Sequence, residues 1–174
     1  MRALLVELAP DFGQGKVFRP NRDVRFSPDK SPYKTHIGAT IGSNYLQLSA
    51  NGLAAASGMH GMAPDQLDRY RRAVAHEGTG TDLEQAISDV ERHAIEVQGH
   101  DSLKSAPKGY PGDHPRIALL QHKSLTAWKE WPVARWLGTV TAKQRIVDFL
   151  TASQPLNEWL SSHVGPSTLP DRRR

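Results

Sequence analysis

Short runs that alternate apolar and polar residues dominate the first third of the chain, after an opening helical stretch. Such alternation places successive side chains on opposite faces of a strand, so that Val24 and Phe26 face away from Asp23 and Arg25. Asn51-Gly52 separates two of the runs and favours a two-residue hairpin turn. The predicted strands cover residues 16–19, 23–27, 35–41, 45–50 and 53–57.

Beyond residue 60, apolar residues recur every three or four positions, which is the spacing of an amphipathic helix. Pro64 suits the first turn of one helix, which Gly78-Thr79-Gly80 is predicted to end. Thr81 and Glu84 form a capping-box pattern for the next helix, whose apolar face continues to Val97. Further predicted elements are a strand over residues 124–131, near a sheet edge, and helices that begin near residues 141 and 155.

These elements predict an α+β fold, in which an antiparallel sheet of meander and hairpin strands carries helices mainly on one face. The chain of 174 residues is long enough for about one domain. We predict a single domain over residues 1–164 and a flexible, basic tail over residues 165–174, which ends in three arginines.

Composition narrows the class of protein. The chain has no cysteine, which excludes disulfides, thiolate nucleophiles and cysteine-ligated metals. No stretch approaches the roughly 20 apolar residues of a membrane span. The first eight residues are too short for a signal peptide and are interrupted by Glu7. These features predict a soluble, cytoplasmic protein without a membrane partner.

Charge is segregated along the chain, although the net charge is only +4. Residues 16–36 carry six Lys or Arg against two Asp, whereas residues 37–100 carry four Arg against eight acids. Arginine binds carboxylates and phosphates through two parallel hydrogen bonds. The basic segment therefore fits an anion site, with a structural network of salt bridges as the alternative.

The basic segment (residues 16–36) and a second loop (residues 104–116) supply the candidate site residues. Imidazole titrates near neutral pH, so His36 in the segment and His114 in the loop could each transfer a proton, with a structural or surface role as the alternative. A carboxylate among the arginines could orient them. The predicted anion-binding side chains of the segment are Arg22, Arg25, Lys30 and Lys34. The predicted catalytic residues are His36, His114 and the orienting Asp23.

Several well-defined site motifs are missing from the sequence. It contains no H-x-x-x-H, H-E-x-x-H or EF-hand pattern, no phosphate-binding loop and no G-x-S-x-G nucleophile elbow. Asp23, Asp29 and Asp113 could meet around Mg²⁺, but three dispersed acids are common in any protein. The sequence therefore predicts neither a metal nor another cofactor.

One long block of unusual residue types covers residues 22–38 and reads R-D-V-R-F-S-P-D-K-S-P-Y-K-T-H-I-G. Further distinctive runs follow at residues 58–60, 107–110, 113–115 and 155–160. On the basis of these runs, the chain resembles a bacterial and fungal family, domain of unknown function 2461. The resemblance extends from about residue 4 to about residue 165.

The resemblance implies an α+β fold and a shared polar cluster, to which it adds Tyr33, Lys104 and Lys108 as ligand-binding residues. Family members usually begin with further helical sequence containing an Asn-Asn-x-x-Trp-Phe-like motif, which this sequence does not show. The resemblance therefore implies one of two alternatives. Either the start of this sequence is truncated or mis-assigned, or this family member has lost a helical layer. Such a loss would expose apolar surface on the sheet.

Three functions fit these residues. The leading hypothesis is binding or turnover of a phosphorylated or nucleotide-like ligand, in an Arg/Lys/His pocket where residues 19–36 and 104–116 meet. A non-enzymatic module that neutralises nucleic-acid phosphates is the first alternative. A structural or protein-interaction domain with a buried salt-bridge network is the second. The sequence does not separate catalysis from binding.

Overall fold

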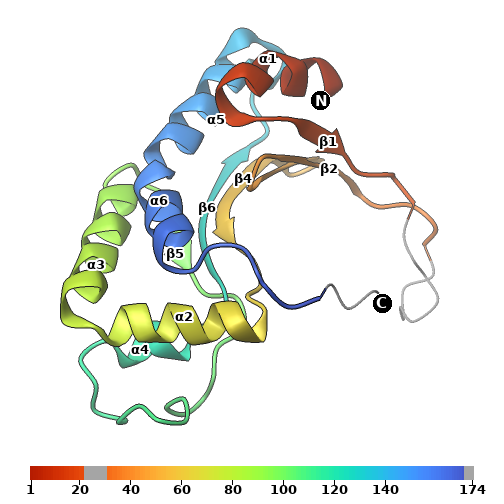
Figure 1. The fold of residues 1–174 in the computed structure, drawn as a ribbon. Coiled ribbons are helices and arrows are strands. Elements are labelled where there is room, and N and C mark those ends of the chain that lie inside the picture. Colours follow the sequence, from red (N-terminus) through yellow and green to blue (C-terminus); the bar gives the residue numbers. More distant parts are fainter. Residues whose placement is uncertain (22–30, 171–174) are drawn as a thin grey trace. The chain divides into compact units, whose positions relative to one another are not determined.

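The computed structural model describes residues 1–21 and 31–170 of the chain (Figure 1). Within these ranges, six strands form one sheet in the order β1-β2-β3-β4-β6-β5, and the pairs β1–β2, β2–β3, β3–β4 and β5–β6 are antiparallel. The strands are β1 (Gly15–Val17), β2 (His36–Ile41), β3 (Asn44–Ser49), β4 (Gly52–Met59), β5 (Glu96–Gln98) and β6 (Leu125–Pro132). The helices are α1 (Arg2–Phe12), α2 (Pro64–Ala75), α3 (Glu77–Glu91), α4 (Ile117–Gln121), α5 (Val140–Ala152) and α6 (Gln154–His163), with a short 3-10 turn η1 (Arg135–Gly138). These elements confirm the predicted α+β fold.

The chain forms two compact units. The first comprises Met1–Ala56 and Lys129–Leu150, and the second comprises Ser57–Trp128 and Thr151–Arg174. The chain passes from one unit to the other within β4, within β6 and near the end of α5. No helix in the described ranges is long and apolar enough to cross a membrane. The prediction of one domain over residues 1–164 stays a prediction, which an unfolding experiment can test.

In the first unit, helices cover one face of the sheet. α1 packs on β1 and β2 (Figure 1). Phe149 of α5 packs edge-on against Trp131 of β6, with 6.1 Å between the ring centroids. Burial of each large apolar side chain contributes about 1.5–3 kcal/mol to stability. The buried apolar residues of this layer include Leu5, Leu8, Ala39, Ile41, Leu46, Ile146 and Phe149.

The structure confirms a hairpin between β3 and β4, but its two-residue turn is Ala50-Asn51, one position before the predicted Asn51-Gly52. β3 pairs with β4 from the pair Ser49 and Gly52 to the pair Tyr45 and Ala56. Gly52 has a positive φ of 126°, and a Cβ atom there would lie 2.1 Å from the carbonyl oxygen of Trp131. Only glycine therefore fits both the backbone conformation and the close approach of β6 at this position.

In the second unit, α2, α3 and α6 pack against one another. Tyr70 and Trp159 lie at their junction, with the rings edge to face and 6.1 Å between the centroids. The Tyr70 hydroxyl donates a hydrogen bond to the Leu119 carbonyl at 3.0 Å, and the Trp159 indole donates one to the Thr79 carbonyl at 2.8 Å. Burial raises the pKa of Tyr70, so its hydroxyl stays a donor. Both aromatic residues thus bury their rings while their polar atoms are satisfied.

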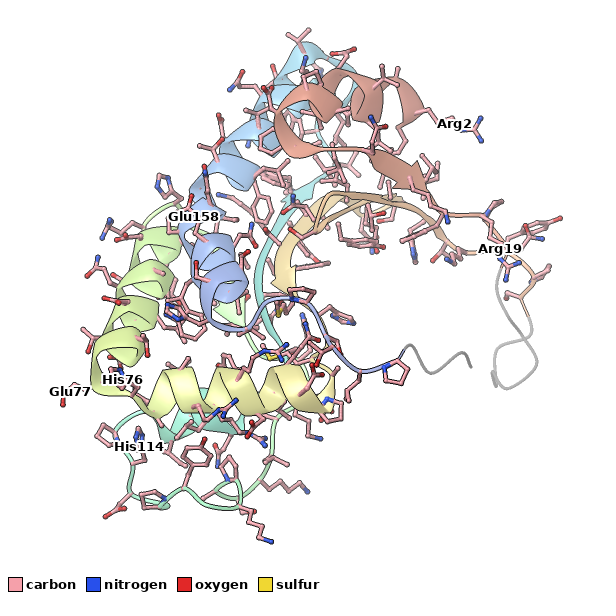
Figure 2. All side chains as sticks on the ribbon, viewed as in Figure 1. Arg2, Arg19, His76, Glu77, His114 and Glu158 are labelled. Atoms are coloured by element: carbon pink, nitrogen blue, oxygen red, sulfur yellow. The ribbon has the colours of Figure 1, made fainter. Side chains whose placement is uncertain are left out.

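Helix α3 begins at Glu77, before the capping box predicted at Thr81 and Glu84. Figure 2 shows His76 and Glu77 where the chain turns from α2 into α3. The Thr79 N–H donates to the His76 ring at 3.5 Å, so His76 is the residue that caps the helix. The predicted capping box is therefore wrong.

Gly80 packs at this corner and does not end a helix. A Cβ atom at Gly80 would lie 2.4 Å from the carbonyl oxygen of Val74 on α2, so glycine allows the two helices to approach each other. Beyond α3, Ala94 adopts a positive φ of 54°, which redirects the chain. Val97, which the apolar spacing placed in the helix, consequently lies in β5.

The segment after α6 runs across the first turns of α2. Asp65 accepts hydrogen bonds from the Thr168 N–H at 2.8 Å and from the Ser167 hydroxyl at 2.7 Å. Arg69 donates from Nε to the Val164 carbonyl at 2.6 Å. The Thr168 N–H, followed by the neighbouring hydroxyl donors, holds the pKa of Asp65 well below its usual range. These contacts attach the start of the C-terminal segment to α2.

Candidate functional site

The predicted site residues fall into three groups. Arg22, Asp23, Arg25 and Lys30 lie outside the described residues. Tyr33, Lys34 and His36 belong to the first unit, and Lys104, Lys108 and His114 belong to the second. The meeting of these groups in one pocket therefore stays a prediction.

In the first unit, a short stem precedes and follows residues 22–30. Asn21 and Tyr33 form an antiparallel bridge. The Lys34 N–H donates to the Pro20 carbonyl at 2.8 Å. Figure 2 shows Arg19 beyond the end of β1, where the chain enters this stem. The described residues on either side of 22–30 are therefore held next to each other.

Two aromatic rings lie beside the stem, on the face of the sheet opposite α1. The rings of Phe18 and Tyr45 are stacked, with 6.3 Å between the centroids and 27° between the planes. A Cβ atom on Gly38 would lie 2.9 Å from the Tyr45 hydroxyl and 3.2 Å from Cδ2 of Phe18. Side chains alternate along a strand, so Gly38 faces away from Ala39, which is buried in the helix-covered layer. The missing side chain at Gly38 therefore makes room for the stacked pair.

A lysine and a glutamine extend this pair. The Lys34 ammonium lies 5.5 Å from the centroid of the Phe18 ring, which is the geometry of a cation–π contact. The Tyr45 hydroxyl donates to Oε1 of Gln47 at 3.0 Å. Partial burial raises the pKa of Tyr45, so the hydroxyl remains protonated near neutral pH. We call Phe18, Lys34, Tyr45 and Gln47 the platform.

Positive charge around the platform is not neutralised within the described part of the chain. No carboxylate of residues 1–21 or 31–170 forms an ion pair with Lys16, Arg19 or Lys34. In contrast, Lys143 of the same unit pairs with Glu7 at 2.9 Å. Within the described residues, these cations therefore lie without acidic partners next to an aromatic ring.

His36 shares the face of β2 that carries Gly38, because the two positions are two residues apart in one strand. Its side chain is half-buried, and its strand partner is Ser49. Among the described residues, the imidazole has no hydrogen-bond or ion-pair partner. The catalytic role predicted for His36 stays a prediction.

His114 contributes to the structure of the second unit. Its Nδ1 atom accepts a hydrogen bond from the Arg116 N–H at 3.0 Å, in the loop before α4 (Figure 2). Because Nδ1 is the acceptor, the neutral ring carries its proton on Nε2. The Arg116 side chain in turn pairs with Glu84 at 2.9 Å. The loop lysines Lys104 and Lys108 are exposed. The catalytic role of His114 stays a prediction.

Reasoning from the sequence missed Phe18 and Tyr45 as site residues. It placed each in or next to a predicted strand, but local spacing does not bring the two rings together. The pairing of β1 with β2 and of β2 with β3 does so, because both rings then flank Gly38. A glycine inside a strand often marks a close approach, and that signal could have indicated the pair.

The model of one protein family matches residues 2–159, and its description is conserved hypothetical protein (DUF2461). The chain belongs to this family. The DUF2461 match includes residues of both compact units and confirms the resemblance seen in the sequence. Neither the curated proteins nor the solved structures contain a match to the chain. The DUF2461 description names no ligand, so any function has to be argued from the site.

Proposed function

We propose that the first unit of this DUF2461 protein binds a phosphorylated, nucleotide-like anion on the platform. The observation that carries the proposal is the Lys34 ammonium over the exposed ring of Phe18, with no acidic partner among the described residues. A nucleotide combines a flat base, which stacks on an aromatic ring, with phosphates, which require cations. The platform supplies both kinds of group next to each other.

The energies of the two contacts support a measurable affinity. Stacking of a base on an aromatic side chain contributes about 1–3 kcal/mol. A hydrogen bond to a charged group contributes about 1.5–3 kcal/mol. Further contacts from Lys16, Arg19 and His36 would add to these contributions. We expect a dissociation constant for ADP between roughly 1 μM and 1 mM, which corresponds to about −8 to −4 kcal/mol.

Isothermal titration with ADP tests the proposal. Lys34→Ala and Phe18→Ala are each expected to weaken ADP binding about 10-fold or more, because each removes one of the two contacts. Lys143→Ala is the matched control, since it removes one positive charge from the same unit at a lysine that already pairs with Glu7. The proposal is contradicted if ADP does not bind to the wild type, or if it binds equally to all three variants.

Pyrophosphate, which has no base, and adenosine, which has no phosphate, test the contacts of Lys34 and Phe18 separately. Lys34→Ala is expected to weaken pyrophosphate binding more than adenosine binding, and Phe18→Ala is expected to do the reverse. A single-stranded oligonucleotide tests the nucleic-acid alternative, because its affinity falls with salt at a slope of about −0.7 per neutralised phosphate. A steep salt dependence for the oligonucleotide, without any binding of ADP, would assign the platform to nucleic acid instead.

A further inference from the structure

Three backbone segments adjoin in the second unit, outside the platform and the predicted site. The Met62 N–H donates to the Lys123 carbonyl at 3.2 Å, and the Lys123 N–H donates to the Asp101 carbonyl at 2.9 Å. The Leu103 N–H donates to the Gln121 carbonyl at 2.9 Å. These hydrogen bonds hold the chain after β4, the chain after β5 and the chain before β6 next to one another.

A serine and a histidine face each other across two of these segments. Ser102 and His122 form an antiparallel bridge, and the Ser102 hydroxyl lies 2.7 Å from Nδ1 of His122. The backbone at Gly99 lies close to the imidazole of His122, since a Cβ atom there would lie 2.3 Å from Nδ1. The ring is thus held in place, while Ser102 is exposed to solvent. This distance lies within the range for a nucleophile and its general base.

The surroundings of His122 favour its neutral imidazole, which can act as a base, over the charged form. Burial lowers the pKa of His122, so its ring is neutral near pH 7 and can accept a proton. The segment also holds backbone strain, since Asp101 adopts a positive φ of 58° although it is not glycine. Two further imidazoles lie on the same segments, with 5.3 Å between the ring centroids of His60 and His100. Strain and clustered imidazoles are features that functional sites share.

We propose that Ser102 is a nucleophile activated by His122, and that the pair hydrolyses small, accessible carboxylic esters. This activity is separate from anion binding on the platform, because the two sets of residues belong to different units. The exposed position of Ser102 suits a small activated ester, since such a carbonyl needs no deep cleft to reach the hydroxyl.

The reaction balances in two steps. In the first, Oγ of Ser102 attacks the ester carbonyl, its proton passes to Nδ1 of His122, the ester C–O bond breaks, and the proton passes on to the leaving alcohol. In the second, water attacks the acyl-serine and gives a proton to Nδ1. The serine C–O bond then breaks, the acid leaves, and the proton returns to Ser102.

A fluorophosphonate probe on the full-length wild-type chain tests the proposal, with the modified residue located by peptide mass mapping. We expect one adduct, on Ser102. His122→Gln keeps a hydrogen-bonding side chain but removes the base, so it is expected to slow labelling about 100-fold or more. Ser105→Ala is the matched control at a nearby exposed serine, and is expected to be labelled like the wild type.

Hydrolysis of p-nitrophenyl acetate gives a second readout, which Ser102→Ala is expected to abolish. Circular dichroism of each variant checks the fold. Where a variant fails to fold, the position of the adduct in the wild-type chain decides the question alone. No adduct, an adduct at another residue, or equal labelling of wild type and folded His122→Gln overturns the proposal.

Discussion

Replacement of Gly52 by alanine is expected to destabilise the first unit, because this position combines two constraints. The backbone has a φ of +126°, a conformation that residues with a side chain rarely adopt. A Cβ atom would also lie 2.1 Å from the carbonyl oxygen of Trp131, where an ordinary contact needs at least 3.4 Å. The atoms in conflict are backbone atoms of a sheet, so they cannot move as freely as the end of a side chain.

The magnitude follows from three contributions. A residue other than glycine in such a backbone conformation costs about 1–3 kcal/mol. Separating the two strands weakens about one hydrogen bond, at about 0.5–1.5 kcal/mol. Alanine restricts the unfolded chain and returns about 0.4–1 kcal/mol. The expected net loss is about 2 kcal/mol, which lowers the melting temperature by roughly 4–8 °C in a chain of this size.

Urea unfolding, followed by tryptophan fluorescence and circular dichroism, measures this loss. Gly138→Ala is the matched control in the same unit, because a Cβ atom there meets nothing within 4 Å and its φ lies outside the left-handed range. Its free energy of unfolding is expected to stay within about 0.5 kcal/mol of the wild-type value. A Gly52→Ala variant as stable as Gly138→Ala would refute the argument from close strand approach.

Two further predictions concern the platform and the C-terminal segment. Gly38→Ala is expected to change the free energy of unfolding by less than about 1.5 kcal/mol. It is expected to weaken ADP binding clearly, because the new Cβ atom displaces the Tyr45 hydroxyl from its position 2.9 Å away. Calorimetry that shows wild-type affinity for ADP would contradict this. Asp65→Asn is expected to lower stability near neutral pH, because the Thr168 N–H holds the pKa of Asp65 below its unfolded value. The carboxylate contributes fully above its unfolded pKa of about 4 and loses its contribution as the pH falls through the folded pKa. The difference between wild type and variant in urea unfolding should therefore shrink from pH 7 to pH 2, and a constant difference would argue against this role of Asp65.

The parts of the fold that the sequence predicted depend on local chemistry. Asn51-Gly52 indicates a hairpin by itself, because few residues other than glycine tolerate the positive φ that Gly52 adopts directly after the turn. Pro64 likewise marks the first turn of α2, since a missing N–H costs nothing there. In both cases the decisive constraint lies within a few residues of the position.

The parts that the sequence did not predict depend on contacts between distant residues. Gly80 reads locally as a helix terminator, but its role is the approach of α3 to the carbonyl oxygen of Val74. Phe18 and Tyr45 become neighbours only through strand register, which local alternation does not specify. The basic segment drew attention to residues 16–36, of which residues 22–30 lie outside the described part of the chain, so its role as an anion site stays a prediction. The described part of its positive charge lies at Lys16, Arg19 and Lys34.

The most direct test of the platform is a titration of the isotope-labelled protein with ADP, followed through its amide resonances. The proposal predicts that the resonances of Phe18, Lys34, Gly38 and Tyr45 shift together and saturate with one dissociation constant. It also predicts that Lys34→Ala moves this constant upward by about 10-fold or more. An absence of shifts at these four residues, or shifts confined to the second unit, would contradict the proposal that the platform binds the anion.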